Sequence, residues 1–448
     1  MKIRITVLCP VAIAVMLIPG CTQKKGPAYE RWGITKTVVD NASEKQLASA
    51  YDLLYSMKLE QAKIAYRKVA KKFPNSAEAH LGLSIAYRYL HRLPKAVTEN
   101  QRALELDSNA VAVQCNYADL LTPHRGAKLK EALNDSARYV LSNSYYLKAA
   151  NSGHPISAYA HIGLWTNYMI LGQLDKARQE LLALGKENYF PKLLSDFAHN
   201  MLISLAPQAI IFTNGDNDTY PLFVLQEYDG FRQDVSVVNI SLLNIPTVAG
   251  LFRDSLKVPI SYSDSELKAM KPEFDSTRGK LVLPSDHLVA NIIQNARKKK
   301  QPVYFATTVA QNRLSSYKDN LILAGLAWEV TNTKTRDSVN IDKVIQNMTE
   351  KYRLDTTGLK QTWPANISPL TRNVSGLAVN YLGLYDLMAN YYKGQNKKDK
   401  AIDCYRKMVQ ITVPLGRNDL TETILDRWLK LKPVDSEAKH LKEKYIRS

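Results

Sequence analysis

The feature that most constrains this chain is the segment between Pro207 and Pro246, in which two β-branched runs flank an amphipathic stretch. The first run, 209–213, leads into a glycine-containing loop, a helical pattern follows over 219–228, and the second run covers 235–240. This order predicts strand, loop, helix and strand. Because such a crossover joins parallel strands, we expect a parallel sheet with a ligand crevice above the carboxyl ends of its strands.

The same alternation of elements continues downstream, over about residues 201–340. A helix is expected over 285–300, and strands are expected over 280–283, 302–308 and 321–331. Strands that alternate with helices indicate a doubly wound sheet. We therefore expect an α/β domain of Rossmann-like type in this part of the chain.

A second pattern, with a period of 34 residues, begins at Ser43 and is repeated from Ala77. Small and large residues recur in register, as expected where two antiparallel helices pack together. The matched positions are Ala50, Leu53, Ala62, Tyr66, Val69 and Pro74 in the first unit and Ser84, Tyr87, Ala96, Asn100, Ala103 and Ser108 in the second. The pattern resembles the tetratricopeptide repeat, although Asn100 and Ser108 stand where an aromatic residue and a proline are usual.

Further units align from Ala158 and from Leu382, so helical hairpins should flank the α/β region, and a helix over 420–445 should close the chain. Repeats bury their apolar faces only against neighbours, so the downstream unit must pack on its own tail and on the α/β domain. The predicted boundaries are a signal peptide over 1–20, a tether over 21–42, a repeat domain over 43–200, a Rossmann-like domain over 201–340 and a C-terminal helical domain with one repeat unit over 341–448.

The N-terminus has the features of a secretory leader. Lys2 and Arg4 precede an apolar run over 5–18 that is too short to span a bilayer. The residues LIPG before Cys21 resemble the recognition box of a bacterial lipoprotein signal, which implies that Cys21 is lipidated and becomes the first mature residue. An ordinary signal peptide that happens to meet a cysteine is the alternative. By resemblance to sorting patterns, the residues after Cys21 favour the outer membrane of the cell envelope.

The charge balance is strongly basic, since 60 Lys and Arg against 42 Asp and Glu give a formal net charge of +18. This favours anionic neighbours such as phospholipid headgroups. We do not expect nucleic acid as a partner, because the positive residues are scattered apart from 297–300, at the end of a predicted helix. Beyond Cys9 and Cys21, the cysteines are Cys115 and Cys404, whose helical patterns are typical of buried free thiols; the sequence leaves a bridge between them open.

Familiar catalytic signatures are missing from the sequence. It has no glycine-rich phosphate loop, no paired histidines at helical spacing, no CxxC and no nucleophile elbow. What remains is the polar loop after the first predicted strand. Asp216 and Asp218 can direct two carboxylates at one divalent metal ion such as Mg²⁺ or Mn²⁺. Alternatively, Asp216 and Asn217 form an Asx turn, and Asp218 caps the helix that starts at Thr219.

Polar residues also end the neighbouring strands, so a ligand site in the crevice would combine them with the loop. The candidate ligand-binding residues are Asn214, Asp216, Asn217, Asp218, Thr219, Asn239, Ser241, Thr307 and Thr308. On the repeats, Tyr51, Tyr55, Arg88 and Tyr89 fall at positions that usually face the groove, where aromatic and arginine side chains anchor a partner. Packing is the alternative role for each tyrosine.

The stretch FTNGDNDTYPLFVLQEYDGFRQDVSVVNISLLN, residues 212–244, is very similar to the soluble C-terminal portion of bacterial membrane proteins related to protein O-mannosyltransferases. PVYFATTV at 302–309 and LILAGLAWEV at 321–330 also match that portion, and the resemblance covers about 206–412. The chain lacks the multi-span membrane half that carries the transferase chemistry in those relatives. The resemblance therefore implies an extracytoplasmic accessory module, and it does not define the module's own activity.

These features are consistent with two functions. In the first, the chain is a non-catalytic envelope lipoprotein that holds a protein or glycan partner, with an α/β domain between repeat-type helices. In the second, it is a metal-dependent protein of glycan processing or sugar binding that uses Asp216 and Asp218. Nucleotide sugars are scarce outside the cytoplasm, which favours the first function. The two differ in whether Mn²⁺ or Mg²⁺ should raise the melting temperature.

Overall fold

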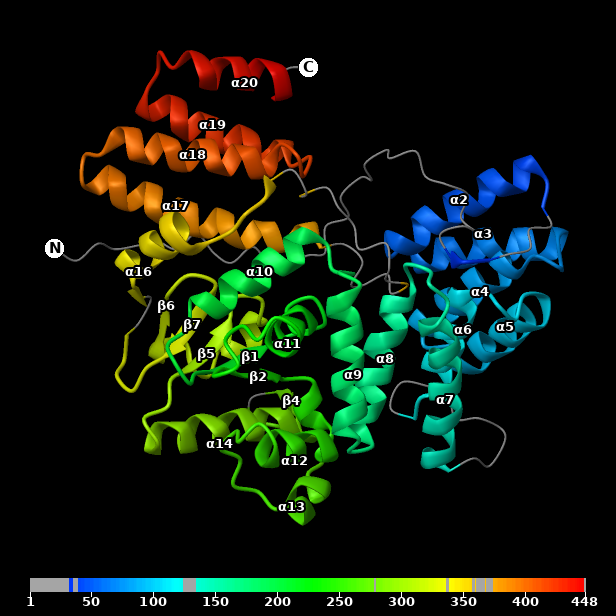
Figure 1. Ribbon diagram of the computed structural model, residues 1–448. Helices are drawn as coiled ribbons and strands as arrows, with labels where there is room; N and C mark the ends of the chain where they lie inside the picture. The colour runs from blue at the N-terminus through cyan, green and yellow to red at the C-terminus, as the bar shows by residue number, and fades with distance from the viewer. Residues whose placement is uncertain are drawn as a thin grey trace. The chain divides into compact units, whose positions relative to one another are not determined.

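The chain forms two compact units, each of which is described by itself (Figure 1). Among the residues that the structure describes, the repeat unit comprises those up to 189 together with Ile367, and the sheet unit comprises the others from 190 onward. The computed structural model describes residues 32–34, 39–123, 134–277, 279–335, 338–356, 359, 367 and 374–446. The predicted signal peptide, Cys21 and most of the predicted tether lie outside the described residues.

The repeat unit consists of antiparallel helical hairpins, as the 34-residue period predicts. Its helices are α2 (Asn41–Tyr55), α3 (Leu59–Lys72), α4 (Ala77–Tyr89), α5 (Leu93–Leu106), α6 (Val111–Leu121), α7 (Asp135–Ala150), α8 (Ser157–Ile170) and α9 (Leu174–Lys186). Each even-numbered helix pairs with the next odd-numbered one, and α2, α4, α6 and α8 also contact one another in turn. These first helices of the hairpins therefore share one face, which is the arrangement of a tetratricopeptide-type repeat.

Packing between successive hairpins explains the departure at Asn100. In the first repeat the ring of Tyr66 lies against Gly82, where a Cβ atom would come within 2.3 Å of the ring. One period later the same two positions are Asn100 and Asn116, and the Asn116 side chain donates to Oδ1 of Asn100 at 2.7 Å. Asn116 also donates to Oγ of Ser84 at 2.8 Å. A hydrogen-bonded pair of amides thus takes the place of an aromatic ring and a glycine.

The sheet unit is built around a mixed six-stranded sheet with the strand order β2-β1-β5-β7-β6-β8. The strands are β1 (Ile210–Thr213), β2 (Ser236–Asn239), β5 (Val303–Ala306), β6 (Leu321–Leu323), β7 (Ala327–Val330) and β8 (Ser338–Val339). β1 is parallel to both β2 and β5, whereas β7 is antiparallel to its neighbours β5 and β6. The strand, loop, helix and parallel strand predicted after Pro207 are present.

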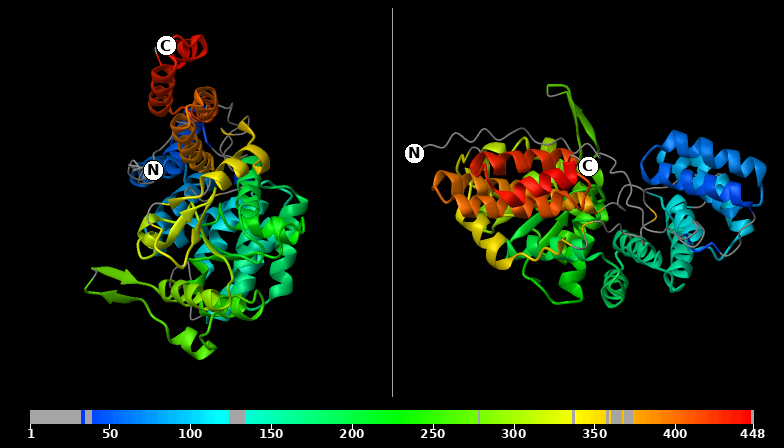
Figure 2. Two further views of the ribbon diagram at one scale, coloured as in Figure 1. Left: turned by 90° about the vertical axis from the view of Figure 1, so that its left-hand side faces the viewer. Right: turned by 90° about the horizontal axis from the view of Figure 1, so that it is seen from above.

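The sheet is mixed, and the parallel pairing predicted for the whole α/β region is found for β2, β1 and β5, so a Rossmann-like doubly wound sheet is not shown. The single strand predicted over 321–331 is instead the β6–β7 hairpin, which reverses direction near Gly325 at a φ of +107° that favours glycine. The strand predicted over 280–283 is β4 (Lys280–Val282), which pairs with β3 (Glu273–Asp275) in a separate sheet. Figure 2 shows this two-stranded hairpin projecting from the sheet unit.

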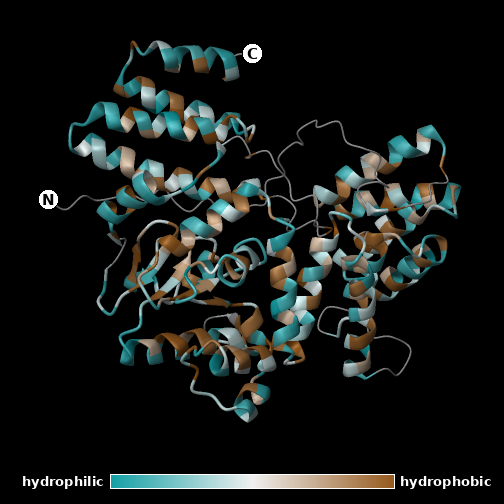
Figure 3. Ribbon diagram, viewed as in Figure 1, coloured by the Kyte–Doolittle hydropathy of each residue, from teal (hydrophilic) through white to brown (hydrophobic). Residues whose placement is uncertain are grey.

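Helices cover the parallel part of the sheet, with α11 and α14 on opposite sides of it (Figure 1). Phe212 and Phe305 meet between β1 and β5 with their ring centroids 5.1 Å apart, and Figure 3 shows the central strands as hydrophobic.

The helical segments of the sheet unit before the C-terminal hairpins are α10 (Lys192–Ile203), α11 (Tyr220–Glu227), η1 (Leu242–Asn244), α12 (Pro246–Asp254), α13 (Asp264–Ala269), α14 (Pro284–Lys298), α15 (Gln311–Leu314), η2 (Lys318–Asn320), α16 (Ile341–Gln346), the π-helical turn η3 (Asn347–Lys351) and η5 (Ser375–Ala378).

The C-terminal helices form two further hairpins. They are α17 (Val379–Gly394), α18 (Lys398–Thr412), α19 (Asn418–Leu431) and α20 (Ser436–Ile446). The single closing helix predicted over 420–445 is therefore wrong, because Pro433 disfavours helical backbone at Lys432, which lies at φ −142°. Asp435 then accepts the N–H of Ala438 at 3.1 Å and caps the new helix.

A buried polar seam joins these helices to the sheet within the sheet unit. Asn200 of α10 donates to the hydroxyl of Tyr381 in α17 at 2.8 Å. The same amide accepts the N–H of Arg353 at 2.8 Å and donates to its carbonyl at 2.5 Å. Tyr352 lies 2.5 Å from the hydroxyl of Ser204 and accepts the N–H of Leu326 at 2.9 Å. The C-terminal hairpins therefore share one set of buried hydrogen bonds with α10 and the β6–β7 hairpin.

Among the residues that the structure describes, no helix is both long and apolar enough to cross a bilayer. Cys115 and Cys404 are buried free thiols, which agrees with the helical patterns in which they lie. Burial raises the pKa of both thiols, to about 12 for Cys404. Neither thiol is suited to act as a nucleophile at neutral pH.

Candidate functional site

The polar loop after β1 is organised by Asp218, whose side chain is buried. The two carboxylate oxygens accept the N–H of Asn214 at 2.9 Å and the N–H of Gly215 at 2.7 Å. The hydroxyl of Thr308, which follows β5, donates to the same carboxylate. Asp218 thus closes the loop on itself and ties it to the end of the neighbouring strand.

The end of β2 meets the loop from the other side. Asn239 donates from its amide to the hydroxyl of Thr219 at 2.9 Å, and the hydroxyls of Thr219 and Thr213 lie 2.7 Å apart. Ser241 donates to the carbonyl of Asn214 at 3.4 Å. The structure therefore brings the predicted loop residues and the polar ends of both adjacent parallel strands to one edge of the sheet.

The remaining candidates of the crevice lie beside this network. Asp216 and Asn217 are half-buried. The hydroxyl oxygen of Thr307 is buried and has no hydrogen-bond partner among the residues that the structure describes.

The start of the following helix differs from the predicted cap. α11 begins at Tyr220 with Thr219 as its N-cap residue, and no side chain accepts a capping hydrogen bond there. Asp218 instead faces back toward the loop, and the N–H groups of Thr219 and Tyr220 donate to the carbonyl of Asp216 at 3.2 and 3.1 Å. Pro221 lies in the first turn and has no N–H to satisfy, which lowers the need for a side-chain cap.

The carboxylate of Asp218, one of the two predicted metal ligands, already accepts hydrogen bonds from the chain. Both oxygens of Asp218 are occupied by N–H and O–H donors, which a cation would have to displace. Burial raises the pKa of Asp218, although hydrogen bonds from Thr308, Asn214 and Gly215 act in the opposite direction. The described part of the chain also contains no group of three or more His, Cys, Asp or Glu side chains that could hold a metal ion.

On the repeats, Tyr51 and Tyr55 contact a segment of the chain's own N-terminal region. The ring of Trp32 lies 5.2 Å from the ring of Tyr51 and 6.2 Å from that of Tyr66. Its indole N–H donates to the hydroxyl of Tyr55 at 3.2 Å, and that hydroxyl donates to the carbonyl of Ile367 at 3.2 Å. Two of the predicted partner-binding residues, Tyr51 and Tyr55, therefore contact Trp32 of the same chain.

Arg88 lies in a buried network that links three hairpins. Its guanidinium forms an ion pair with Asp119 of α6. The hydroxyls of Tyr146 and Tyr159 donate to the two oxygens of the same carboxylate at 2.5 Å each. Tyr89, the last residue of α4, is half-buried, and its ring lies 5.1 Å from the guanidinium carbon of Arg88. Arg88 therefore stabilises the stack of repeats through this network.

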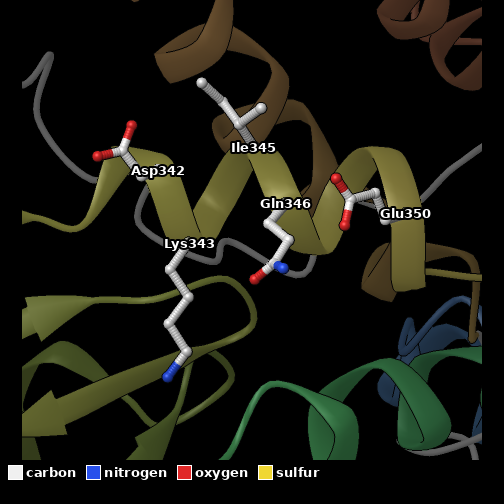
Figure 4. A pocket seen from close by; sticks show the side chains of 5 residues that line it. All are labelled: Asp342, Lys343, Ile345, Gln346 and Glu350. Carbon is white, nitrogen blue, oxygen red and sulfur yellow. The ribbon is translucent and has the colours of Figure 1, made fainter.

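A shallow cavity of about 540 Å³ lies elsewhere in the sheet unit, along α16 and η3 (Figure 4). Figure 4 shows Lys343 pointing toward the strands, where its ammonium lies 5.7 Å from the centre of the Tyr304 ring. Burial lowers the pKa of Lys343. The residues that line the cavity are Asp342, Lys343, Ile345, Gln346 and Glu350. Both charge signs are present on one short helical segment, so the cavity has no clear preference for an anion or a cation.

Sequence reasoning missed Trp32, Ile367 and Asp119. Trp32 lies in the polar stretch interpreted as a tether, where a lone tryptophan beside Gly33 and Ile34 was the available signal. Ile367 lies more than 300 residues away in sequence from Tyr55, and no local pattern connects them. Asp119 occupies a helix with many apolar residues, where a buried carboxylate requires a paired cation.

Together, the hairpins and the mixed sheet define a protein that combines tetratricopeptide-type helical repeats with an α/β domain. Residues 194–264 match the family described as TMEM260-associated domain 2. This match contains β1, the polar loop, α11 and β2, which lie within the stretch that carries the resemblance to the mannosyltransferase-related proteins.

Two solved structures are similar to part of the chain. One is PilW, described as a widely conserved type IV pilus biogenesis factor, with 18% identity, a TM-score of 0.31 and coverage of 51% of this chain and 98% of that one. The other is PilF of Pseudomonas aeruginosa, with 20% identity, a TM-score of 0.32 and coverage of 48% of this chain and 86% of that one. A comparison with curated proteins gave no match.

Proposed function

We propose that this protein is a non-catalytic lipoprotein of the bacterial cell envelope that holds a protein partner on its helical repeats. Lipid attachment at Cys21 would supply the membrane contact, with the outer membrane as its place. The observation that carries the proposal is the contrast between the two candidate surfaces. The polar groups of the strand-end loop are largely engaged with one another, whereas the repeats present successive first helices on one shared face.

Tyr89 is the position from which a partner should be captured. It lies one 34-residue period after Tyr55, the residue whose hydroxyl holds the Trp32 indole, so the same surface position recurs on the second hairpin. It is half-buried at the end of α4. Aromatic side chains at such positions supply large contact areas for a partner at a low cost in conformational entropy.

The experiment is photo-cross-linking in cells that express the full chain. A photoreactive amino acid in place of Tyr89 should give one discrete cross-linked complex, and the same residue in place of Ile64, an exposed side chain on α3, should not. Mass analysis of the purified protein should also find an N-terminus at Cys21 that carries acyl chains. Identical cross-linked products from both positions, or an unmodified Cys21, would contradict the proposal.

The proposed function and the metal-dependent alternative make opposite predictions for the loop. If the proposed function is right, Mn²⁺ or Mg²⁺ should leave the melting temperature unchanged, because the carboxylate of Asp218 already accepts hydrogen bonds from the chain itself. If millimolar metal raised the melting temperature, and if Asp216→Asn abolished that rise, the loop would be a metal site and the second function would be favoured.

A further inference from the structure

We propose that the repeats carry, at the first helical hairpin and the adjoining Val111 and His154, a peptide-binding pocket for a Trp-Gly-aliphatic sequence, and that residues 32–34 of this chain occupy it as an internal ligand. The walls of the pocket are the rings of Tyr51, Tyr55 and Tyr66. This inference deepens the proposed function and rests on it, because it names the kind of segment that a partner presents to the repeats.

The tryptophan is held as a specific ligand, both by its ring and by its N–H group. Its side chain is 1% exposed although it lies in a polar stretch of the sequence. Ring contacts with Tyr51 and Tyr66 bury the indole, and the hydroxyl of Tyr55 accepts its N–H at 3.2 Å. Because the Tyr55 O–H donates a hydrogen bond to the carbonyl of Ile367, the hydroxyl is oriented with its lone pairs toward the indole.

The glycine is required at the next position for two separate reasons. Gly33 has a φ of +63°, a region that favours glycine. A Cβ atom there would also come within 3.0 Å of the Val111 side chain and 3.4 Å of His154. The aliphatic third residue, Ile34, is 5% exposed. The tryptophan is therefore recognised by rings and a hydroxyl, the glycine by its backbone conformation and the close approach of Val111, and the aliphatic residue by burial.

Because residues 32–34 already occupy the pocket, they regulate the binding of a partner segment by competing with it. A short connection to α2 holds residues 32–34 near the pocket at an effective concentration in the millimolar range, so a free peptide competes poorly with them. A partner that presents the same sequence binds only when the internal segment leaves. The segment that would leave follows directly from the stretch beside the proposed lipid anchor, which couples occupancy of the pocket to the membrane-proximal end of the chain.

The test uses a fluorescein-labelled peptide of residues 29–38, YERWGITKTV, and fluorescence anisotropy with the full-length chain. The peptide should bind the Trp32→Ala chain on the order of 100-fold more tightly than the wild-type chain, because the internal competitor is gone. Adding Tyr55→Phe should weaken that binding roughly tenfold, since it removes the hydroxyl but keeps the ring. Ile64→Ala in the Trp32→Ala chain is the matched control and should leave the affinity unchanged.

Peptide variants test the recognised sequence directly. A peptide with Trp32→Ala, and one with Gly33→Ala, should each lose most of the affinity for the Trp32→Ala chain. Equal affinity of the parent peptide for wild-type and Trp32→Ala chains would overturn the proposal. So would a failure to bind a Trp32→Ala chain whose far-ultraviolet circular dichroism and melting temperature show an intact repeat unit.

A second measurement covers the case in which Trp32→Ala does not fold. A site-specific protease sequence replaces residues 35–38, and the folded chain is then cut. The N-terminal fragment should stay bound and should be released by excess peptide; immediate release without peptide overturns the inference. If the peptide binds while cross-linking from position 89 captures nothing, the peptide pocket is supported and the proposed function is contradicted. If cross-linking captures a partner while the peptide does not bind, the peptide pocket is contradicted and the proposed function is not.

Discussion

At the scale of single residues, Asp218 shows how a carboxylate at the spacing of a metal pair can organise its own loop. The spacing of Asp216 and Asp218 is that of a metal pair, yet the Asp218 carboxylate closes its own loop through the N–H groups of Asn214 and Gly215. A carboxylate that accepts hydrogen bonds from its own backbone is pre-organised without any ligand. The residue types were visible in the sequence, but which donors they would meet depended on the neighbouring strand that ends at Thr308.

The raised pKa of Asp218 gives a pH-dependent prediction. Burial raises the pKa of this carboxyl above its ordinary value of 3.8, so its contribution to stability is fully present below that value and is lost as pH rises through the folded-state pKa. Asp218→Asn removes this titration. The free energy of unfolding of the wild type relative to Asp218→Asn should therefore fall as pH rises from about 3 to about 6. Urea denaturation at a series of pH values measures it, and a difference that grows with pH would contradict the assignment.

At the scale of elements, the repeat period predicted the hairpins well because each helix packs mainly on its neighbours in sequence. The C-terminal pair α17 and α18 was found in the same way. The β6–β7 hairpin and the break at Pro433 were not predicted. A continuous apolar run predicts one strand unless the backbone conformation of Gly325 is known. At Pro433, the amphipathic pattern continues although the helix ends. These failures arise where one residue's backbone conformation overrides the hydrophobic pattern.

The exchange of Tyr66 and Gly82 for Asn100 and Asn116 gives a prediction at this scale. Gly82→Asn alone should destabilise the repeat unit by about 1–3 kcal/mol, because the new side chain meets the Tyr66 ring. Tyr66→Asn alone should cost about 3–5 kcal/mol through the lost ring. The double variant reproduces the pair of the second repeat, so its cost should be smaller than the sum by at least about 1 kcal/mol.

A double-mutant cycle by chemical denaturation measures this coupling. Ile64→Ser, at an exposed position on the same helix as Tyr66, is the control and should show no coupling with Gly82→Asn. Strict additivity of the two core substitutions would mean that the two asparagines do not act as a replacement pair.

At the scale of the whole molecule, segments that follow one another in the sequence do not always belong to the same compact unit. The C-terminal hairpins belong to the sheet unit, whereas Ile367, which precedes them in sequence, belongs to the repeat unit. Sequence patterns predicted where the helices and most strands lie, because those depend on local periodicity. They could not predict the contact between Tyr55 and Ile367, or the seam from Asn200 to Tyr381, because those contacts join residues far apart in the chain.

The variant Asn200→Ala tests whether the buried polar seam stabilises the sheet unit. Asn200→Ala leaves the backbone groups of Arg353 and the hydroxyl of Tyr381 without their partner, which should cost about 2–3 kcal/mol. Proteins with two compact units often unfold in separable steps. Hydrogen exchange should therefore report faster opening of α10 and α17 and unchanged protection of α4 and α6. Equal loss of protection in both sets of helices would contradict this assignment.

The central claim is that the repeats, and not the strand-end loop, are the working surface of the molecule. The most direct measurement is a calorimetric titration of the purified partner captured from position 89 against three full-length chains: wild type, Tyr89→Ala and Asp216→Asn. We expect Tyr89→Ala to weaken binding at least about tenfold, since a central aromatic contact contributes more than about 1.4 kcal/mol. Asp216→Asn should bind as the wild type does. Binding that is lost with Asp216→Asn and kept with Tyr89→Ala would contradict the claim.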